Sequence, residues 1–187
     1  MNNNKTSELK FSKRLSIGLF CIGTLIMIVF AATLSATVAF VGYLFSGLSF
    51  CLGSVYFIIL IINIARRKTD QSTGLKSIGI LLINIPIAAF YVYLVMVLLN
   101  TARITFENTT GHDLSSIKIF GCGDKEINFL EAGESETVWI HIPSDCSLEI
   151  NYVIEGQIKI ETVASYLANS NGVIATYKIG SNQEIFL

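Results

Sequence analysis

The stretch VLLNTARITFENTTG, residues 97–111, joins two different kinds of sequence. It begins as the end of an apolar helix, and it continues with alternating residues in which Ile104 and Phe106 mark one face of a strand. It ends in residues that favour turns. Only about three residues separate the expected helix end near Leu99 from the expected strand start near Arg103. We therefore expect the chain to change from helix to sheet within this stretch.

Composition and charge differ on the two sides of this junction. The 187 residues are 52% hydrophobic and 14% charged, with a mean hydropathy of +0.60, whereas soluble domains carry about 25% charged residues. Residues 1–100 hold eight Lys or Arg and two Asp or Glu, a net charge of +6, and residues 101–187 hold five and twelve, a net charge of −7. These values predict a membrane-inserted first half and an acidic second half, which disfavours nucleic acid as a partner.

Residues 15–64 form a run of fifty residues without Asp, Glu, Lys, Arg or His. One helix of that length would reach about 75 Å, against about 30 Å for the hydrocarbon core, so the run must cross the membrane twice. Two glycines predict the reversal within residues 41–47, because glycine permits sharp changes of backbone direction. The expected spans are residues 15–40 and 46–64.

A third span is expected at residues 77–99, which are also free of charged residues. Pro86 lacks a backbone donor and crowds the carbonyl of Leu82, which predicts a kink near residues 82–86. Asn84 beside the kink either bonds a freed carbonyl or neighbouring helix, or marks a polar point on a transport pathway. The absence of ionisable residues from all three spans weighs against a proton-coupled or ion-coupled transporter acting alone.

Basic residues lie in the tail 1–14 and in the loop 65–76, and positively charged segments prefer the cytoplasm. Two crossings between these segments place both on the same side, in agreement with the length argument. The third span then carries residues 101–187 outside, to the periplasm or the extracellular side of a bacterial inner membrane. A cleaved signal peptide ending near residues 31–36 is the alternative, but the apolar run exceeds the usual h-region of about 7 to 15 residues.

Small residues recur at four-residue spacing within the first expected span, at Ala31, Ser35 and Ala39. This small-xxx-small pattern lets helix backbones approach closely. The stripe would pack either within the chain's own hairpin or against another subunit, and the sequence does not set the oligomeric state.

Residues 101–187 show short alternating runs separated by turn-forming residues. Seven short strands in about 85 residues predict a small antiparallel β-sandwich outside the membrane, so that the whole chain is of the membrane α + β class. After the first strand, the runs are 114–120, 125–130, 136–142, 147–154, 157–164 and 173–179.

Two cysteines, Cys122 and Cys146, lie in predicted turns of this outer domain. A disulfide between them is permitted outside the cytoplasm, and closing a loop of this size stabilises a domain by about 3 kcal/mol. Cys21 and Cys51 lie in the expected spans, where they are small apolar packing residues.

Candidate catalytic residues in the outer domain are His112, Asp113, His141, Asp145 and the two cysteines. A Cys nucleophile paired with His would need a free thiol, which competes with the disulfide. The spacings also lack the close C-x-x-C pair of structural zinc sites, and no common catalytic motif is present. We therefore assign no catalytic residues, no metal and no cofactor, and we favour a protein that is not an enzyme while leaving an enzyme component open as an alternative.

One face of the strand 136–142 carries Thr137, Trp139 and His141. These residues form a contact patch, since Trp is enriched at interface anchors, or they belong to the core, or they face the bilayer. The triplet Asn108-Thr109-Thr110 matches a glycosylation sequon. In a bacterial protein we expect these residues only to form a turn.

The expected function is a non-enzymatic, membrane-anchored interaction module. It would be an accessory subunit of a cell-envelope complex, whose partners are the lipid bilayer and another envelope protein. The first alternative is a membrane-held inhibitor or immunity-like protein against an envelope-acting toxin. The second is a component of a membrane transporter or enzyme.

Overall fold

The fold is that of a computed structural model, which describes residues 2–66, 71–181 and 183–185. The chain divides into two compact units, Met1–Leu94 and Val95–Leu187. The first unit is helical. The second unit contains the last turn of the final helix together with all of the strands.

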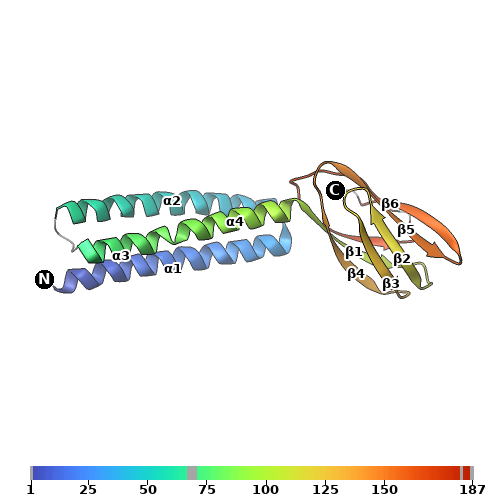
Figure 1. Ribbon diagram of the computed structural model, residues 1–187, viewed down its shortest axis with the longest axis horizontal. Helices are drawn as coiled ribbons and strands as arrows, with labels where there is room; N and C mark the ends of the chain where they lie inside the picture. The colour runs from blue at the N-terminus through green and yellow to red at the C-terminus, as the bar shows by residue number, and fades with distance from the viewer. Residues whose placement is uncertain (1, 67–70, 182, 186–187) are drawn as a thin grey trace. The chain divides into compact units, whose positions relative to one another are not determined.

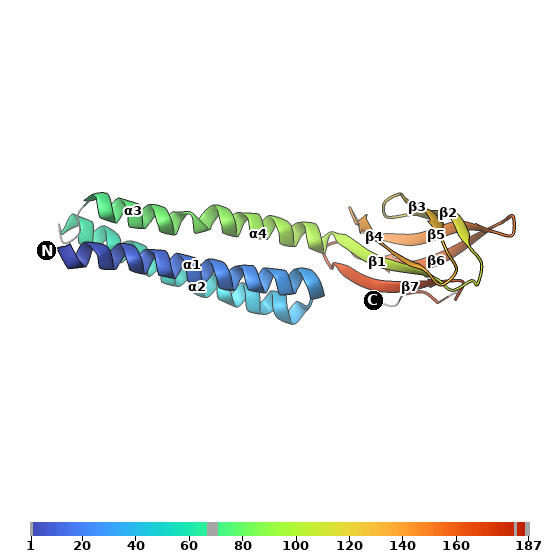
Figure 2. The ribbon, with the colours of Figure 1, turned by 90° about the horizontal axis from the view of Figure 1, so that it is seen from below.

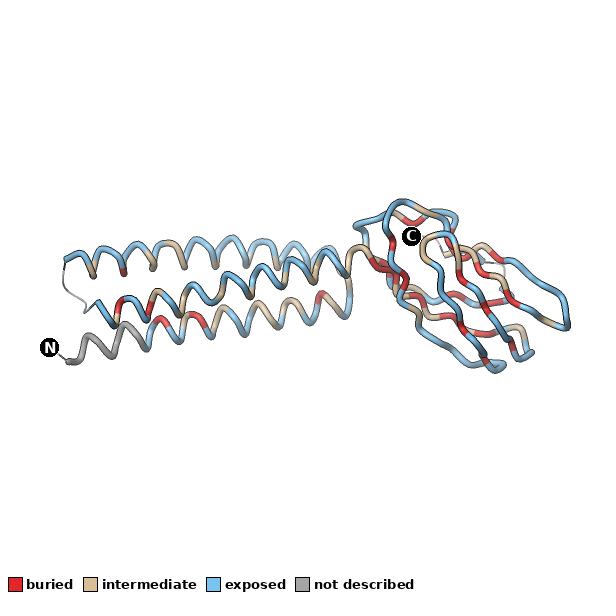
Figure 3. Tube along the Cα trace, in the orientation of Figure 1, coloured by how far each residue is buried: buried red, intermediate tan, exposed pale blue. Residues whose placement is uncertain are grey.

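The described residues form four helices (Figure 1): α1 Asn2–Thr33, α2 Ala36–Ala65, α3 Gln71–Leu82 and α4 Asn84–Leu99. With α3 and α4 taken together, they supply three segments that are long and apolar enough to cross a membrane, Lys10–Thr33, Ala36–Ala65 and Gln71–Leu99. Most residues of these helices are exposed or half-buried (Figure 3), including many large apolar side chains. A helix that is apolar on all sides and not covered by protein is typical of a membrane span.

The reversal between α1 and α2 lies at Leu34 and Ser35, and the prediction that placed it within residues 41–47 is wrong. Leu34 has a positive φ of 47°. The hydroxyl of Thr33 donates to the carbonyl of Val29 and accepts from the N–H of Ser35. The N–H of Ser35 thus bonds a side chain instead of a helical carbonyl, so the helical ladder ends here, whereas glycine is tolerated inside apolar helices.

The predicted stripe of small residues does not form one helix face. Ala31 belongs to α1, Ser35 lies in the reversal and Ala39 belongs to α2. Close packing occurs instead at Gly23 and Gly42. A Cβ atom at Gly42 would lie 3.3 Å from Ile26 Cγ2, and one at Gly23 would lie 3.5 Å from a ring carbon of Phe45. The glycines serve helix packing rather than reversal.

Hydroxyl groups connect α1 to the other helices of the first unit. Ser12 Oγ lies 3.2 Å from the hydroxyl of Tyr56 in α2. The hydroxyls of Thr24 and Tyr91 are hydrogen-bonded between α1 and α4. These contacts satisfy polar groups that would otherwise be costly in an apolar environment.

The helix over residues 71–99 is interrupted at Ile83, between α3 and α4. This break falls within the stretch where Pro86 predicts a kink. Pro86 lies in the first turn of α4, where backbone N–H groups have no helical partner, so its missing donor costs little there. Asn84, the first residue of α4, is half-buried.

The second unit contains seven described strands in two sheets (Figure 2). The strand order is β4-β1-β7 in one sheet and β3-β2-β5-β6 in the other. The strands are β1 Thr101–Asn108, β2 Leu114–Phe120, β3 Lys125–Leu130, β4 Ser135–His141, β5 Cys146–Ile154, β6 Gln157–Leu167 and β7 Val173–Ile179. Six of them match the predicted runs within about three residues at each end, and β1 begins at Thr101, directly after the helix.

The pairing of β1 with β7 is parallel, so the prediction of a purely antiparallel domain is wrong. β7 follows β6, which belongs to the other sheet, and a connection between sheets can deliver a strand in either direction. Every other pairing among the described strands is antiparallel.

Apolar side chains from both sheets form one hydrophobic core, which includes Ile104 of β1, Ile117 of β2 and Ile150 of β5. Most of the buried residues among those that the structure describes lie in this unit (Figure 3). Cys122 and Cys146 pack against the core and are joined by a disulfide with their Cα atoms 5.3 Å apart. Cys21 and Cys51 are free and exposed on the helices.

Candidate contact site

The predicted contact patch lies on the exposed face of the three-stranded sheet. Trp139 of β4 is directly opposite Arg103 of β1, which in turn is opposite Ile174 of β7. Trp139 is 50% exposed, so it is not part of the core. The guanidinium carbon of Arg103 lies 4.9 Å from the centre of the Trp139 ring. A cation–π contact of this kind contributes about 0.5 to 1 kcal/mol at an exposed site.

Other polar side chains on this face are paired with one another. The hydroxyls of Thr137 and Thr105 are 2.8 Å apart, and Lys178 Nζ lies 3.9 Å from a carboxylate oxygen of Glu107. Exposed pairs of this type are weak, but they satisfy the groups that carry them. The face is therefore largely occupied by its own contacts.

A second surface, which the sequence analysis missed, lies on the outer side of the four-stranded sheet. We call it the outer row. It contains four exposed apolar residues, Phe129, Val153, Ile158 and Ile160, whose exposed fractions are 52%, 37%, 72% and 64%. In the strand register Phe129 of β3 is opposite Ser115 of β2, Ser115 is opposite Val153 of β5, and Val153 is opposite Ile158 of β6. The members of the row therefore lie on three of the four strands, with the polar Ser115 between Phe129 and Val153.

The outer row is unusual because Ile158 and Ile160 belong to the alternating pattern of β6 but point away from the core. The inward positions of this strand are taken by Glu161 and Val163. Exposed large apolar side chains that gather on one face of a small domain commonly mark a site of interaction. Its sequence signal was the alternation of isoleucine with polar residues in the edge segment QIKI, residues 157–160.

Asn100 connects the last turn of α4 to the sheets. Its carbonyl oxygen accepts a hydrogen bond from the N–H of Ile142 at 2.9 Å and lies 3.0 Å from Nδ1 of His141. Its side-chain oxygen accepts from the N–H of Ser170 at 3.2 Å, and its side-chain nitrogen donates to the carbonyl of Met96 at 2.8 Å.

The final carbonyl groups of α4 are also satisfied from outside the helix. The N–H of Gly172 donates to Leu99 at 2.8 Å, and the hydroxyl of Thr101 donates to Val97 at 2.7 Å. The last carbonyls of a helix otherwise have no partner within it. The helix end and the sheets are consequently joined by a hydrogen-bonded junction rather than by a free linker.

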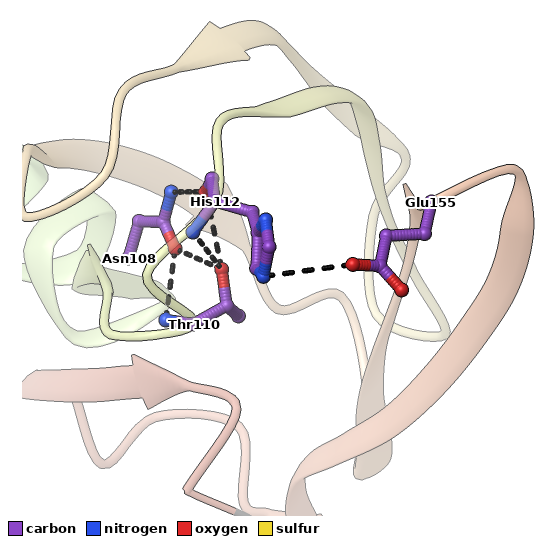
Figure 4. Close-up of polar contacts among 4 residues, drawn as sticks. All are labelled: Asn108, Thr110, His112 and Glu155. Carbon is purple, nitrogen blue, oxygen red and sulfur yellow. Dashed lines mark hydrogen bonds and ion pairs between the residues drawn. The ribbon is translucent and has the colours of Figure 1, made fainter.

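The sequon asparagine, Asn108, is the last residue of β1, and its side chain is hydrogen-bonded to Thr110 and His112 of the following turn (Figure 4). The side-chain nitrogen of Asn108 donates to the carbonyls of His112, Leu130 and Glu131 at 2.8 to 3.0 Å. Its side-chain oxygen accepts from the N–H and hydroxyl of Thr110. Asn108 is fully buried and holds the turn, so it presents no amide for glycosylation.

Glu161 is a buried carboxylate between the two sheets. It accepts hydrogen bonds from the hydroxyls of Tyr152 in β5 and Tyr177 in β7, and from the N–H of Gly180. Burial and these bonds raise the pKa of both tyrosines. A buried charge is tolerated when several donors surround it, so this cluster is a structural link.

The candidate catalytic residues do not come together. His141 is opposite Thr101 at the start of β1, whereas His112 follows the other end of that strand, and both cysteines are in the disulfide. His112 Nε2 lies 3.8 Å from a carboxylate oxygen of Glu155, with both side chains mostly exposed (Figure 4). Within the described residues, no three His, Cys, Asp or Glu side chains are grouped so as to hold a metal ion.

The two acidic candidates have structural partners. The carboxylate of Asp113 accepts the N–H of Ala132 at 3.0 Å. Asp145 accepts the hydroxyl of Tyr166 at 2.7 Å and the N–H of Asn169, and these two bonds lower the pKa of Asp145. Each carboxylate fixes a loop, and neither faces a nucleophile.

No protein-family model matches the chain, and no curated protein sequence is significantly similar to it. A protein from Eubacterium rectale, known from an NMR structure, matches with 14% identity and a TM-score of 0.35. The match covers 46% of this chain and 84% of that protein.

Proposed function

We propose that the chain is a non-enzymatic, membrane-anchored interaction module that acts as an accessory subunit of a bacterial cell-envelope complex. Its three apolar segments cross the membrane with the N-terminus in the cytoplasm, and its two sheets form a β-sandwich at the outer face. The length of the segments and the basic residues of 1–14 and 65–76 support this topology. Arg67 and Lys68 of that loop lie outside the described residues.

The outer row carries the functional proposal. Four apolar side chains are exposed on a domain region with a net charge of −7. Burying apolar surface contributes about 25 cal/mol per Å² to the free energy of association. Covering the outer row with the apolar centre of a partner's interface is therefore favourable. The row lies on strands and is therefore held at fixed positions.

The junction at Asn100 supports the same role. A free linker lets a domain explore a wide volume, whereas here the end of α4 and the sheets are joined by hydrogen bonds without a free linker between them. Such a domain suits contact with a neighbouring envelope protein. It suits catalysis on distant substrates poorly.

Photo-crosslinking in cells tests the contact surface. We would place a photoreactive phenylalanine analogue at Ile158 in one strain and at Ile174, an exposed isoleucine of the other sheet, in a second strain. We expect a discrete higher-mass adduct from position 158 alone, and its loss when Ile160 is replaced by Ser. Adducts from position 174 alone, or from neither position, would contradict the proposal.

Protease protection tests the topology independently. In intact spheroplasts an added protease should digest residues 101–187 and spare the loop 65–76. The opposite pattern would place the sheets in the cytoplasm and remove the basis of an envelope function.

A further inference from the structure

A groove lies between α1 and α3, which run side by side in Figures 1 and 2. Its volume is about 680 Å³. Two lysines and a mostly apolar wall line it: Lys13, Lys76, Ile17, Gly79, Ile80 and Ile83. It belongs entirely to the first unit and is remote in sequence from the outer row.

Helical spacing places these residues on two facing stripes. On α1, Ile17 follows Lys13 by one turn, and on α3, Ile80 follows Lys76 by one turn, because residues four apart share a helix face. Ser16 Oγ donates to the carbonyl of Ile80 at 3.1 Å and ties the two helices together beside the groove.

Glycine keeps the groove open. A Cβ atom added at Gly79 would meet no other atom within 4 Å, so the space beside this residue is free of protein atoms. Because Gly79 lines the groove, we expect a larger side chain at this position to take up part of its space.

The charge in the groove is positive and unbalanced. Among the described residues, neither Lys13 nor Lys76 forms an ion pair with a carboxylate, and the groove lining contains no acidic residue. Lysine stems lie along apolar surface while the ammonium groups reach the polar boundary of the membrane. Two ammonium groups above an apolar wall match a molecule with an anionic head and a hydrocarbon tail.

We propose that this groove binds an anionic phospholipid. The phosphate lies between the ammonium groups of Lys13 and Lys76, and an acyl chain lies along Ile17, Ile80 and Ile83. From Lys76 to Ile83 the helix rises about 10 Å, which accommodates part of one chain. Basic pockets between membrane helices are established sites for lipid headgroups. The proposal requires membrane insertion but is independent of the outer row.

Native mass spectrometry of the full chain in mild detergent tests the proposal. The protein would be titrated with phosphatidylglycerol or with phosphatidylcholine of the same acyl chains. We expect one molecule of phosphatidylglycerol to be retained preferentially. Replacing Lys13 or Lys76 by Gln should weaken retention about fivefold for each lysine, and Gly79→Leu should abolish it while leaving both charges in place.

Matched variants separate the groove from general charge and helix effects. Arg14→Gln removes the same charge from an exposed neighbour that does not line the groove, and Gly18→Leu adds the same bulk at another open helical glycine. Both should retain lipid as the natural protein does. Equal retention of the two lipids, equal loss in Arg14→Gln, or unchanged retention in Gly79→Leu would overturn the proposal. Displacement of the lipid by excess inorganic phosphate would also overturn it, because the site would then be one for free phosphate.

Discussion

Nδ1 of His141 lies 3.0 Å from the backbone carbonyl oxygen of Asn100. A carbonyl oxygen only accepts, so Nδ1 is the donor in this contact. The histidine that the sequence assigned to a contact patch therefore also supports the end of α4. This relationship gives His141 a structural role that needs no catalytic partner.

Replacing Asn100 by Ala should loosen the junction, because its side chain bonds both Met96 and Ser170. We expect the free energy of unfolding of the sheet domain to fall by about 1 to 2 kcal/mol and amide exchange at Gly172 to accelerate. The fluorescence of Trp139, the single tryptophan of the chain, reports this unfolding. Asn128→Ala, an exposed asparagine on β3, is the matched control and should change stability by less than about 0.5 kcal/mol. Equal effects of the two variants would contradict this role of Asn100.

Replacing Asn108 by Ala should lower the free energy of unfolding more than replacing Asn100 does. The change removes the partner of the buried carbonyl of Leu130 and opens the turn held by Thr110. Unsatisfied buried groups cost about 1 to 3 kcal/mol each, so we expect a loss of about 2 to 4 kcal/mol in denaturant unfolding. His112→Ala, which removes only an exposed contact with Glu155, should cost less than about 0.5 kcal/mol. A loss of unfolding free energy below about 1 kcal/mol in the Asn108 variant would contradict the conclusion that Asn108 holds the turn.

The positions of the strands could be predicted because short alternating runs and turn residues are local signals. The parallel pairing of β1 with β7 could not, since it joins residues about seventy positions apart and depends on which sheet each strand enters. The reversal at Leu34 was missed for a related reason. Glycine is a turn signal in water, but in apolar helices it also allows close packing, as at Gly42.

In the candidate sites, too, features set by residues close in sequence could be predicted, and features set by the pairing of distant strands could not. The alternation placed Thr137, Trp139 and His141 on one face of a strand, because alternation is local, but it left open whether that face is core or surface, and the structure shows all three exposed. The outer row was missed because it assembles Phe129 and Ile158 from strands that are not neighbours in sequence. Glu161 reads as a surface residue in the sequence, and only the tyrosines of two other strands make its burial possible.

The cluster around Glu161 predicts a specific loss of stability at alkaline pH. Burial, followed by hydrogen bonding to Glu161, raises the pKa of Tyr152 and of Tyr177 above the ordinary value of about 10. A raised pKa in the folded state means that this stabilisation is fully present below about pH 10 and is lost as the pH rises towards the folded-state pKa. Denaturant midpoints measured by Trp139 fluorescence should therefore fall above pH 10.

The slope of that loss identifies the groups responsible. Each tyrosine contributes up to about 1.4 kcal/mol per pH unit, because the unfolded chain releases a proton that the folded chain retains. Replacing both Tyr152 and Tyr177 by Phe should flatten the dependence above pH 10, at the cost of a lower stability at neutral pH. An unchanged slope in the double variant would assign the alkaline transition to other groups.

The disulfide between Cys122 and Cys146 gives a prediction that also tests the compartment of the sheets. A disulfide persists in an oxidising compartment and is rare in the cytoplasm. Protein unfolded without reductant should therefore accept two alkylating groups, at Cys21 and Cys51, and four after reduction. The reduced sheet domain should unfold with about 3 kcal/mol less stability than the oxidised one, because the open chain gains conformational entropy in the unfolded state.

The natural protein must be alkylated immediately on cell lysis, so that the number of reactive thiols reflects the protein in the cell and not later oxidation by air. Four reactive thiols before reduction would show that the bridge is absent in cells, and together with protease-resistant sheets in spheroplasts would reverse the proposed orientation.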